Sequence, residues 1–300
     1  MTGPAADPAS AARSAVRAEP LLDVATLDRL AALGVAQLAR AVTGLGGGVG
    51  PAGAPGAETV DHRPYVPGDD LRRIDANVFA RLRQRVVRLA PSEAQVGVAV
   101  LVDASGSVEG ELRAVLRVAA LLGAVALLSG DVAQPVALRD GDALPGPRLA
   151  GPRALPELLA SLEDVRAGGT TTLASSVARA RRAVGDAPLA VLVTDGLVPA
   201  ADLAAAAADL HAVVHVTAAP DLPAGPLDLV DAETGERLPV QLDPRTRAAY
   251  AARAEAHATA LRRACLRAGV EYASTTPSAD PFTLLTDLAD RGTLLTRSTR

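Results

Sequence analysis

Apolar and polar positions divide the C-terminal part of the chain into two kinds of segment. Short, continuous apolar runs are typical of buried strands, and we expect strands at residues 96–102, 134–138, 189–194, 211–217 and 270–273. Longer runs with apolar residues three or four positions apart are typical of amphipathic helices. They predict helices at residues 111–128, 155–165, 173–184, 200–210 and 244–267.

The alternation of these segments predicts the fold class. Parallel strands need crossover connections, and right-handed crossovers place helices on both faces of a sheet. We therefore expect residues 95–300 to form a doubly wound parallel α/β sheet. Residues 227–240 interrupt the alternation, because they hold the polar segment Asp-Ala-Glu-Thr-Gly-Glu between two apolar runs, which favours a β-hairpin.

Local signals mark several helix ends. Asp243 and Asp280 each stand before a proline, and an acidic N-cap followed by proline is a common helix start. Gly269 follows the helix predicted at 244–267, at the place where glycine commonly ends a helix. A further helix is therefore expected after Asp280.

The N-terminal part is organised differently. Residues 1–20 lack a helical or strand pattern and are expected to be a disordered lead-in. Residues 21–94 are expected to form a smaller arginine-rich subdomain, in which residues 21–45 have mostly helical spacing. The glycine-rich segment 44–56 lacks the Gly-Lys-Ser/Thr of a phosphate-binding loop, so we expect a flexible loop there.

Composition narrows the function classes. The 300 residues include three Tyr, two Phe and no Trp, so the core must consist of Ala, Val and Leu, and base-stacking platforms are disfavoured. The formal net charge of −4 gives no general attraction to nucleic acid. Cys265 is the single cysteine, which argues against a disulfide within the chain and against a cysteine-based zinc cluster.

We expect a cytoplasmic protein with no membrane span, because the longest apolar run, 118–128, is shorter than the roughly 20 residues that a spanning helix needs.

Residues 61–88 are unusually rich in arginine, with seven arginines against four aspartates. One interpretation is a docking face for an acidic partner or for phosphate, with candidate contacts at Arg63, Arg72, Arg73 and Arg81. The other is an internally paired subdomain in which arginines and aspartates bind one another. The sequence leaves both interpretations open.

Oxygen-bearing side chains follow two of the predicted strands and one glycine turn. They are Asp103, Ser105 and Ser107 after the first strand, Thr170 and Thr171 after two glycines, and Asp195 after the third strand. Ligands in doubly wound folds gather at the carboxyl ends of the strands, so we expect these oxygens to converge. Carboxylate and hydroxyl oxygens suit Mg²⁺, or Mn²⁺ as a close substitute, and a soft metal does not fit. A cation held by so few carboxylates would keep an open position for an acidic side chain of another protein.

This pattern resembles the metal-ion-dependent adhesion site of von Willebrand factor type A domains, in which D-x-S-x-S, a threonine and a later aspartate bind the metal. On this resemblance the metal ligands are Asp103, Ser105, Ser107, Thr171 and Asp195. Thr170 is the alternative to Thr171.

The arginine-rich segment makes the resemblance more specific. The run from Arg63 to Arg81, followed by Glu93 and then D-x-S-x-S, is similar to the bacterial family called domain of unknown function 58, or DUF58. The similarity extends over residues 21–291, and the chain departs from it at Ala76, where the family usually has tryptophan. The resemblance implies an adaptor or chaperone-like partner of a MoxR-type AAA+ ATPase.

The sequence therefore predicts a non-enzymatic, metal-dependent protein-binding module. The alternative is a magnesium-dependent phosphohydrolase, because oxygen-ligated cations at α/β strand ends also serve phosphoryl transfer. Against it, the motif places serine where a second catalytic aspartate is expected, and the chain has no lysine to bind phosphate. A serine hydrolase is disfavoured because no Gly-x-Ser-x-Gly elbow surrounds Ser105 or Ser107.

Overall fold

The computed structural model describes residues 20–32, 37–38, 62–64, 86–88, 96–170, 172–185, 189–217, 223–291 and 295–296. By contacts within the chain, residues 1–42 and 96–300 form one unit and residues 43–95 form another. In the second unit, β2 (His62–Pro64) pairs antiparallel with β3 (Val86–Arg88). Of the four candidate arginines, Arg63 lies in β2, while Arg72, Arg73 and Arg81 lie outside the described residues.

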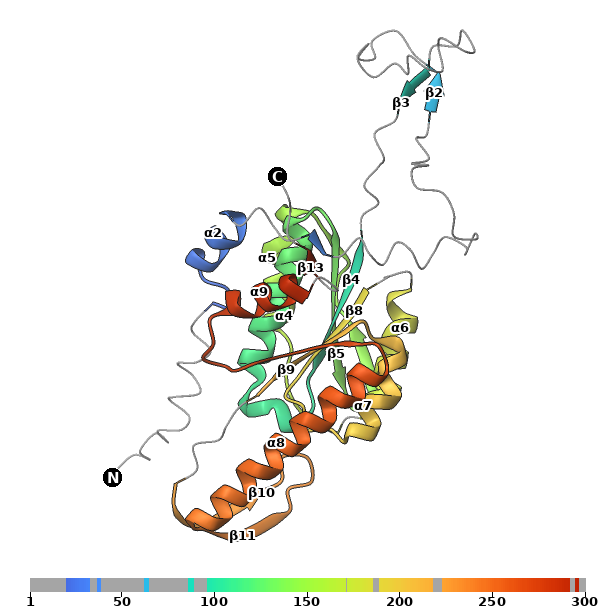
Figure 1. Cartoon of the computed structure of the whole chain (residues 1–300). Coiled ribbons are helices and arrows are strands. Elements are labelled where there is room, and N and C mark those ends of the chain that lie inside the picture. Colours follow the sequence, from blue (N-terminus) through green and yellow to red (C-terminus); the bar gives the residue numbers. More distant parts are fainter. Residues whose placement is uncertain are drawn as a thin grey trace, which may run out of the picture. The chain divides into compact units, whose positions relative to one another are not determined.

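The first unit is built on a mixed sheet with strand order β12-β9-β8-β4-β5-β6, and β7 pairs with β5 (Figure 1). Five strands run parallel, as the alternating pattern predicts. They are β4 (Gly97–Asp103), β5 (Val132–Arg139), β8 (Leu189–Thr194), β9 (Ala212–Val216) and β12 (Glu271–Thr275).

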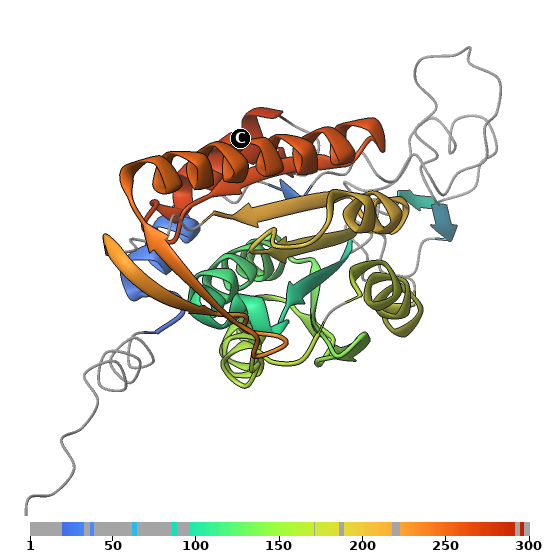
Figure 2. The same cartoon turned by 90° about the horizontal axis from the view of Figure 1, so that it is seen from below.

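Helices cover both faces of this sheet (Figure 2). In β4, Val98, Val100 and Val102 belong to the core on the side of α4, while Ala99 and Leu101 belong to the core on the side of α6. The helices are α2 (Val24–Ala32), α4 (Leu112–Leu128), α5 (Leu155–Glu163), α6 (Leu173–Val184), α7 (Ala200–Ala206), α8 (Pro244–Arg267) and α9 (Pro281–Arg291). The fold class is therefore a doubly wound α/β domain, as expected.

The structure describes a core that matches the composition. The largest fully buried side chains are all leucines, among them Leu101, Leu121 and Leu192. Cys265 is buried and carries a free thiol, whose pKa burial raises to about 11. Within the described part of the chain, no helix combines the length and the apolar character needed to cross a membrane.

Two expectations need correction. The sheet is not wholly parallel, because β6 (Asp142–Pro145) and β7 (Leu149–Ala150) both run antiparallel to β5. Asp140 and Gly141 join β5 to β6 with positive φ angles of 56° and 71°, the backbone that a two-residue hairpin turn requires. The helix expected across residues 21–45 is also wrong in part, since Gln37–Leu38 form β1, which pairs with β13 (Leu295–Thr296) at the other end of the chain.

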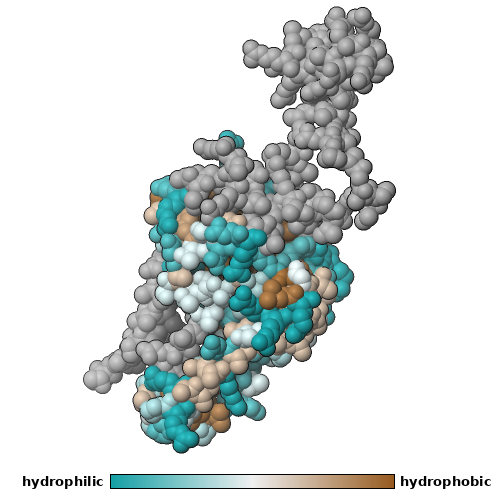
Figure 3. Space-filling view, in the orientation of Figure 1, coloured by the Kyte–Doolittle hydropathy of each residue, from teal (hydrophilic) through white to brown (hydrophobic). Residues whose placement is uncertain are grey.

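A two-stranded hairpin precedes α8, as the polar segment between two apolar runs predicts. It consists of β10 (Gly225–Val230) and β11 (Arg237–Leu242), which form a sheet of their own. Most of both strands and the first half of α8 are exposed, and hydrophilic and hydrophobic residues mix over this surface (Figure 3). The exposed apolar side chains here include Val230, Leu238 and Tyr250.

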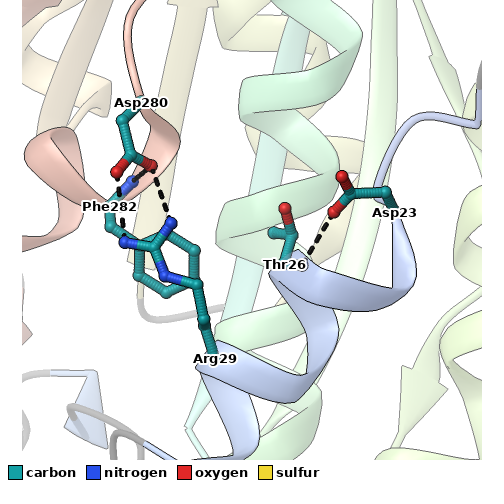
Figure 4. Close-up of polar contacts among 5 residues, drawn as sticks. All are labelled: Asp23, Thr26, Arg29, Asp280 and Phe282. Carbon is teal, nitrogen blue, oxygen red and sulfur yellow. Dashed lines mark hydrogen bonds and ion pairs between the residues drawn. The ribbon is translucent and has the colours of Figure 1, made fainter.

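The segment before the sheet packs onto the α/β unit. Leu21, Leu22 and Leu30 belong to the same core as α4 and α9. The contacts within the chain group residues 1–42 with the α/β unit and residues 43–95 separately. The sequence had instead predicted one subdomain over residues 21–94. Arg29 forms an ion pair with Asp280 at 3.1 Å, and its guanidinium lies 3.7 Å from the ring centre of Phe282 (Figure 4). This contact joins α2 to the start of α9.

Candidate metal centre

The candidate site lies where β4 and β8 end beside each other. The two strands are parallel neighbours, with Val102 of β4 opposite Val193 of β8. After β4 the chain continues to β5 on one side, and β8 leads to β9 and β12 on the other side. Strand order therefore reverses between β4 and β8, which is where doubly wound folds bind ligands.

Asp103 stands at the end of β4 and is fully buried. Its Oδ1 accepts hydrogen bonds from the backbone N–H of Ser105 at 3.1 Å and from the Ser105 hydroxyl at 2.8 Å. Its Oδ2 accepts a hydrogen bond from the Thr194 hydroxyl at 2.7 Å. The carboxylate is thus fixed from both strands, and the Ser107 hydroxyl lies 3.0 Å from that of Ser105.

Asp195 follows β8 and is 6% exposed. Its Oδ1 accepts a hydrogen bond from the backbone N–H of Leu197 at 2.9 Å. Its Oδ2 is buried and has no hydrogen-bond partner among the described residues. A buried carboxylate oxygen without a partner is costly, so this atom calls for a ligand.

The surroundings of Asp195 hold the pKa of its carboxyl far above its ordinary value. Burial is the largest cause, and the negative charges of Asp103 and Glu111 also raise the pKa. The hydrogen bond from the Leu197 N–H and the nearby Ser107 hydroxyl lower it. The result is a pKa of about 6, so that charging Asp195 at neutral pH works against folding.

Two histidines hold the backbone of the Asp195 loop. His215 of β9 donates from Nε2 to the Asp195 carbonyl at 2.8 Å, and the Tyr272 hydroxyl lies 2.6 Å from its Nδ1. Since the carbonyl can only accept, Nε2 carries the proton, and burial lowers the pKa of His215, which keeps the ring neutral. His257 of α8 donates from Nε2 to the Gly196 carbonyl at 2.8 Å.

A third loop is attached to the same strand end. The backbone N–H of Gly168 donates to the Ala104 carbonyl, and the backbone N–H of Gly106 donates to the Gly169 carbonyl, both at 3.0 Å. The glycine turn before α6 therefore lies beside Ser105, as expected. Thr170 follows this turn and is exposed, whereas Thr171 lies outside the described residues.

The residues present fit a hard divalent cation. Among the described side chains, no group of three or more His, Cys, Asp or Glu converges on one point. The donors at the strand ends are instead two carboxylates, from Asp103 and Asp195, and the hydroxyls of Ser105 and Ser107. A cation here would bind oxygen only, which suits Mg²⁺ or Mn²⁺.

The sequence did not reveal three of the residues that build this site. Thr194 was part of a predicted strand, and His215 and His257 had no motif around them. Their roles come from contacts between β8, β9 and α8 that no local spacing encodes. The one available signal was that Thr194 directly precedes Asp195 at a strand end, where a hydroxyl can reach the neighbouring strand.

Fold and site together define the class of protein, a doubly wound α/β domain with oxygen donors at the switch point of its sheet. The family described as "Protein of unknown function DUF58" matches residues 61–260. The chain therefore belongs to the DUF58 family, as its motifs predict. No curated protein matches the chain.

Solved structures similar to the chain include von Willebrand factor A domains. The SpRpn10 VWA domain is 12% identical over 66% of this chain and 95% of that chain, with a TM-score of 0.36. The vWF domain of the type V pili tip protein Mfa5 from Porphyromonas gingivalis is 15% identical, and the match covers 68% of this chain and 98% of that chain, with a TM-score of 0.34. An uncharacterized membrane spanning protein from Vibrio fischeri is 20% identical, and the match covers 64% of this chain and 96% of that chain, with a TM-score of 0.24.

We expect Asp195→Asn to stabilise the metal-free protein at neutral pH. A carboxyl whose pKa rises on folding makes stability fall as the pH rises, here between about pH 4 and pH 6. The rise from 3.8 to about 6 corresponds to about 3 kcal/mol above that window. Urea unfolding in the presence of a chelator should show variant and wild type equally stable near pH 4 and the variant more stable at pH 7. A difference independent of pH would contradict this assignment.

We also expect Gly196→Ala to destabilise the protein more than Gly269→Ala does. The two glycines have nearly the same φ, 73° and 72°, so both variants incur a backbone cost of about 1–2 kcal/mol. A Cβ at Gly196 would in addition collide with the His215 imidazole, whereas a Cβ at Gly269 meets nothing within 4 Å. Urea unfolding should separate the variants by at least about 1 kcal/mol, and equal losses would show that His215 does not constrain the loop.

Proposed function

We propose that this protein is a non-enzymatic binding module that uses a divalent cation to bind a partner protein. Asp103, Ser105, Ser107 and Asp195 would hold Mg²⁺ or Mn²⁺, and an acidic side chain of the partner would complete the site. The observation that carries the proposal is the buried Oδ2 of Asp195, which has no hydrogen-bond partner among the described residues and lies in a site shared with Asp103.

The charges of the site support a bound cation. Asp103 and Asp195 are both buried, and the negative charge of Asp103 raises the pKa of Asp195. A divalent cation would offset the negative charge at the site, and the Oδ2 of Asp195 would become one of its ligands. When bound, the cation supplies a positive charge that attracts a carboxylate from outside.

The surface beside the site suits a protein partner. Leu197, two residues after Asp195, is 66% exposed, which is unusual for a large apolar side chain. An apolar contact next to a charged one provides both affinity and orientation at an interface. The family resemblance points to a MoxR-type AAA+ ATPase as that partner.

Metal binding is tested by calorimetry with MgCl₂ and MnCl₂. We expect the wild type to bind either cation and Asp103→Ala and Asp195→Asn to bind at least about tenfold more weakly, because each removes one of two carboxylates. At 100 times the dissociation constant, the cation should stabilise the wild type by about 2.7 kcal/mol. The control is Asp287→Asn on α9, which removes an exposed carboxylate that pairs with Arg291.

Asp195→Asn is the decisive variant, because it is expected to fold more stably than the wild type without metal. Loss of cation binding in this variant cannot then be attributed to unfolding. Equal heats for wild type, Asp103→Ala and Asp195→Asn would refute the metal site.

The partner is tested by pull-down from a native extract with MgCl₂ or with a chelator. We expect a MoxR-type AAA+ ATPase to be retained by the wild type and by Asp287→Asn only when magnesium is present. Asp195→Asn should retain it under neither condition. Retention that is indifferent to the chelator would separate partner binding from the cation.

A further inference from the structure

The turn of the β10–β11 hairpin lies against the candidate metal centre. A Cβ built on Gly106 would lie 2.9 Å from the carbonyl oxygen of Ala232 in this turn and 3.1 Å from the carbonyl oxygen of Gly169. The segment between Ser105 and Ser107 is therefore enclosed by the glycine turn on one side and the hairpin turn on another. In Figures 1 and 2 the hairpin reaches the end of the sheet at which β4 finishes.

The turn has a defined shape of its own. The Oδ1 of Asp231 accepts hydrogen bonds from the backbone N–H groups of Glu233 at 2.9 Å and Thr234 at 2.7 Å. The backbone N–H of Gly235 donates to the Asp231 carbonyl at 2.9 Å, and Gly235 has a φ of 74°. Asp231 is thus engaged within the turn, and the backbone of Glu233 is held next to Ala232.

Glu233 is the carboxylate that this turn brings to the site. Its side chain is exposed, yet its pKa is raised by partial burial, by the charge of Asp231 and by the charge of Asp103 at the end of β4. A negative charge beside Asp103 is unfavourable without metal and becomes favourable when a cation lies between the two. The hairpin turn thus brings an acidic residue of this chain next to the segment that carries Ser105 and Ser107.

The hairpin can leave this position without disturbing the main sheet. β10 and β11 pair only with each other among the described strands, and apart from Leu242 their residues are exposed or half-buried.

We infer that the turn between β10 and β11 is a resident cap of the metal centre, in which the Glu233 carboxylate occupies the position of the partner's acidic side chain until the partner displaces it. This inference rests on the proposed function. In this role Glu233 competes with the partner's acidic side chain for one position on the cation. Asp103 and Asp195 differ from it, because they stay bound to the cation when the partner binds.

The experiment uses Mn²⁺ as the metal, because the water-proton relaxation of protein-bound Mn²⁺ reports the exchangeable waters on the ion. Three full-length proteins are compared: the wild type, Glu233→Gln and Glu236→Gln. The last is the matched control, since it removes a carboxylate from the same exposed turn. We expect Glu233→Gln to gain about one exchangeable water on Mn²⁺, with the control equal to the wild type.

Acetate then serves as a probe for the partner's carboxylate. In Glu233→Gln a neutral amide replaces the carboxylate, so acetate should reduce the relaxation at about tenfold lower concentration than in the wild type, where it competes with a tethered carboxylate. The affinity for Mn²⁺ should weaken by no more than about tenfold, because one nearby charge is lost while both buried carboxylates remain.

The outcomes separate this inference from the proposed function. If Mn²⁺ binds all three proteins with equal relaxation and equal acetate response, the cap is refuted and the metal site stands. If Glu233→Gln abolishes Mn²⁺ binding, Glu233 is an essential ligand and cannot be a displaceable cap. If the wild type binds no Mn²⁺, both the proposed function and the inference fall.

Discussion

The structure of the site depends on two carboxylates that the fold buries at neighbouring strand ends. Asp103 has hydrogen bonds to both of its oxygens, from Ser105 and from Thr194, so its burial is largely compensated. Asp195 has a donor for Oδ1 but, among the described residues, none for Oδ2, and its pKa is correspondingly raised. This imbalance is a cost to the stability of the metal-free fold, and it is the reason why a cation would bind here.

The surrounding elements keep these carboxylates in place. Backbone hydrogen bonds attach the glycine turn to Ala104 and Gly106, and the imidazole of His215 supports the Asp195 carbonyl. α8 contributes His257 to the same loop and directly follows the hairpin in the chain. The helix thus connects the turn that carries Glu233 to the loop that carries Asp195, so both halves of the proposed site share one support.

Local pattern was sufficient for the parts of this structure that are decided locally. The apolar run located β8, which is buried along its whole length, and the helical spacing located α6, whose buried residues recur three or four positions apart. The start of α8 was located by its N-cap, Asp243, which precedes a proline. The motif D-x-S-x-S located Asp103, because the motif begins where an apolar strand ends. Pairing between distant segments was not predictable: β1 depends on β13, and β6 depends on a turn at Asp140 and Gly141. The same limit hid the contact between Ala232 and Gly106, since the hairpin was visible in sequence but its position over β4 was not.

The proposed cap also answers a question of specificity. A cation bound by two carboxylates with an open position would accept any small carboxylate, so the cation alone cannot select a partner. A tethered glutamate would compete for the open position on the cation at an effective concentration in the millimolar range, which disfavours weak ligands that bind through a single carboxylate. A protein that also contacts the apolar side chains of Leu197 and Val230, which are 66% and 56% exposed, has additional binding energy with which to displace the turn. Under this proposal selectivity would arise from the combined contacts rather than from the metal, because a ligand that engages both surfaces would replace Glu233 more readily than a small carboxylate would.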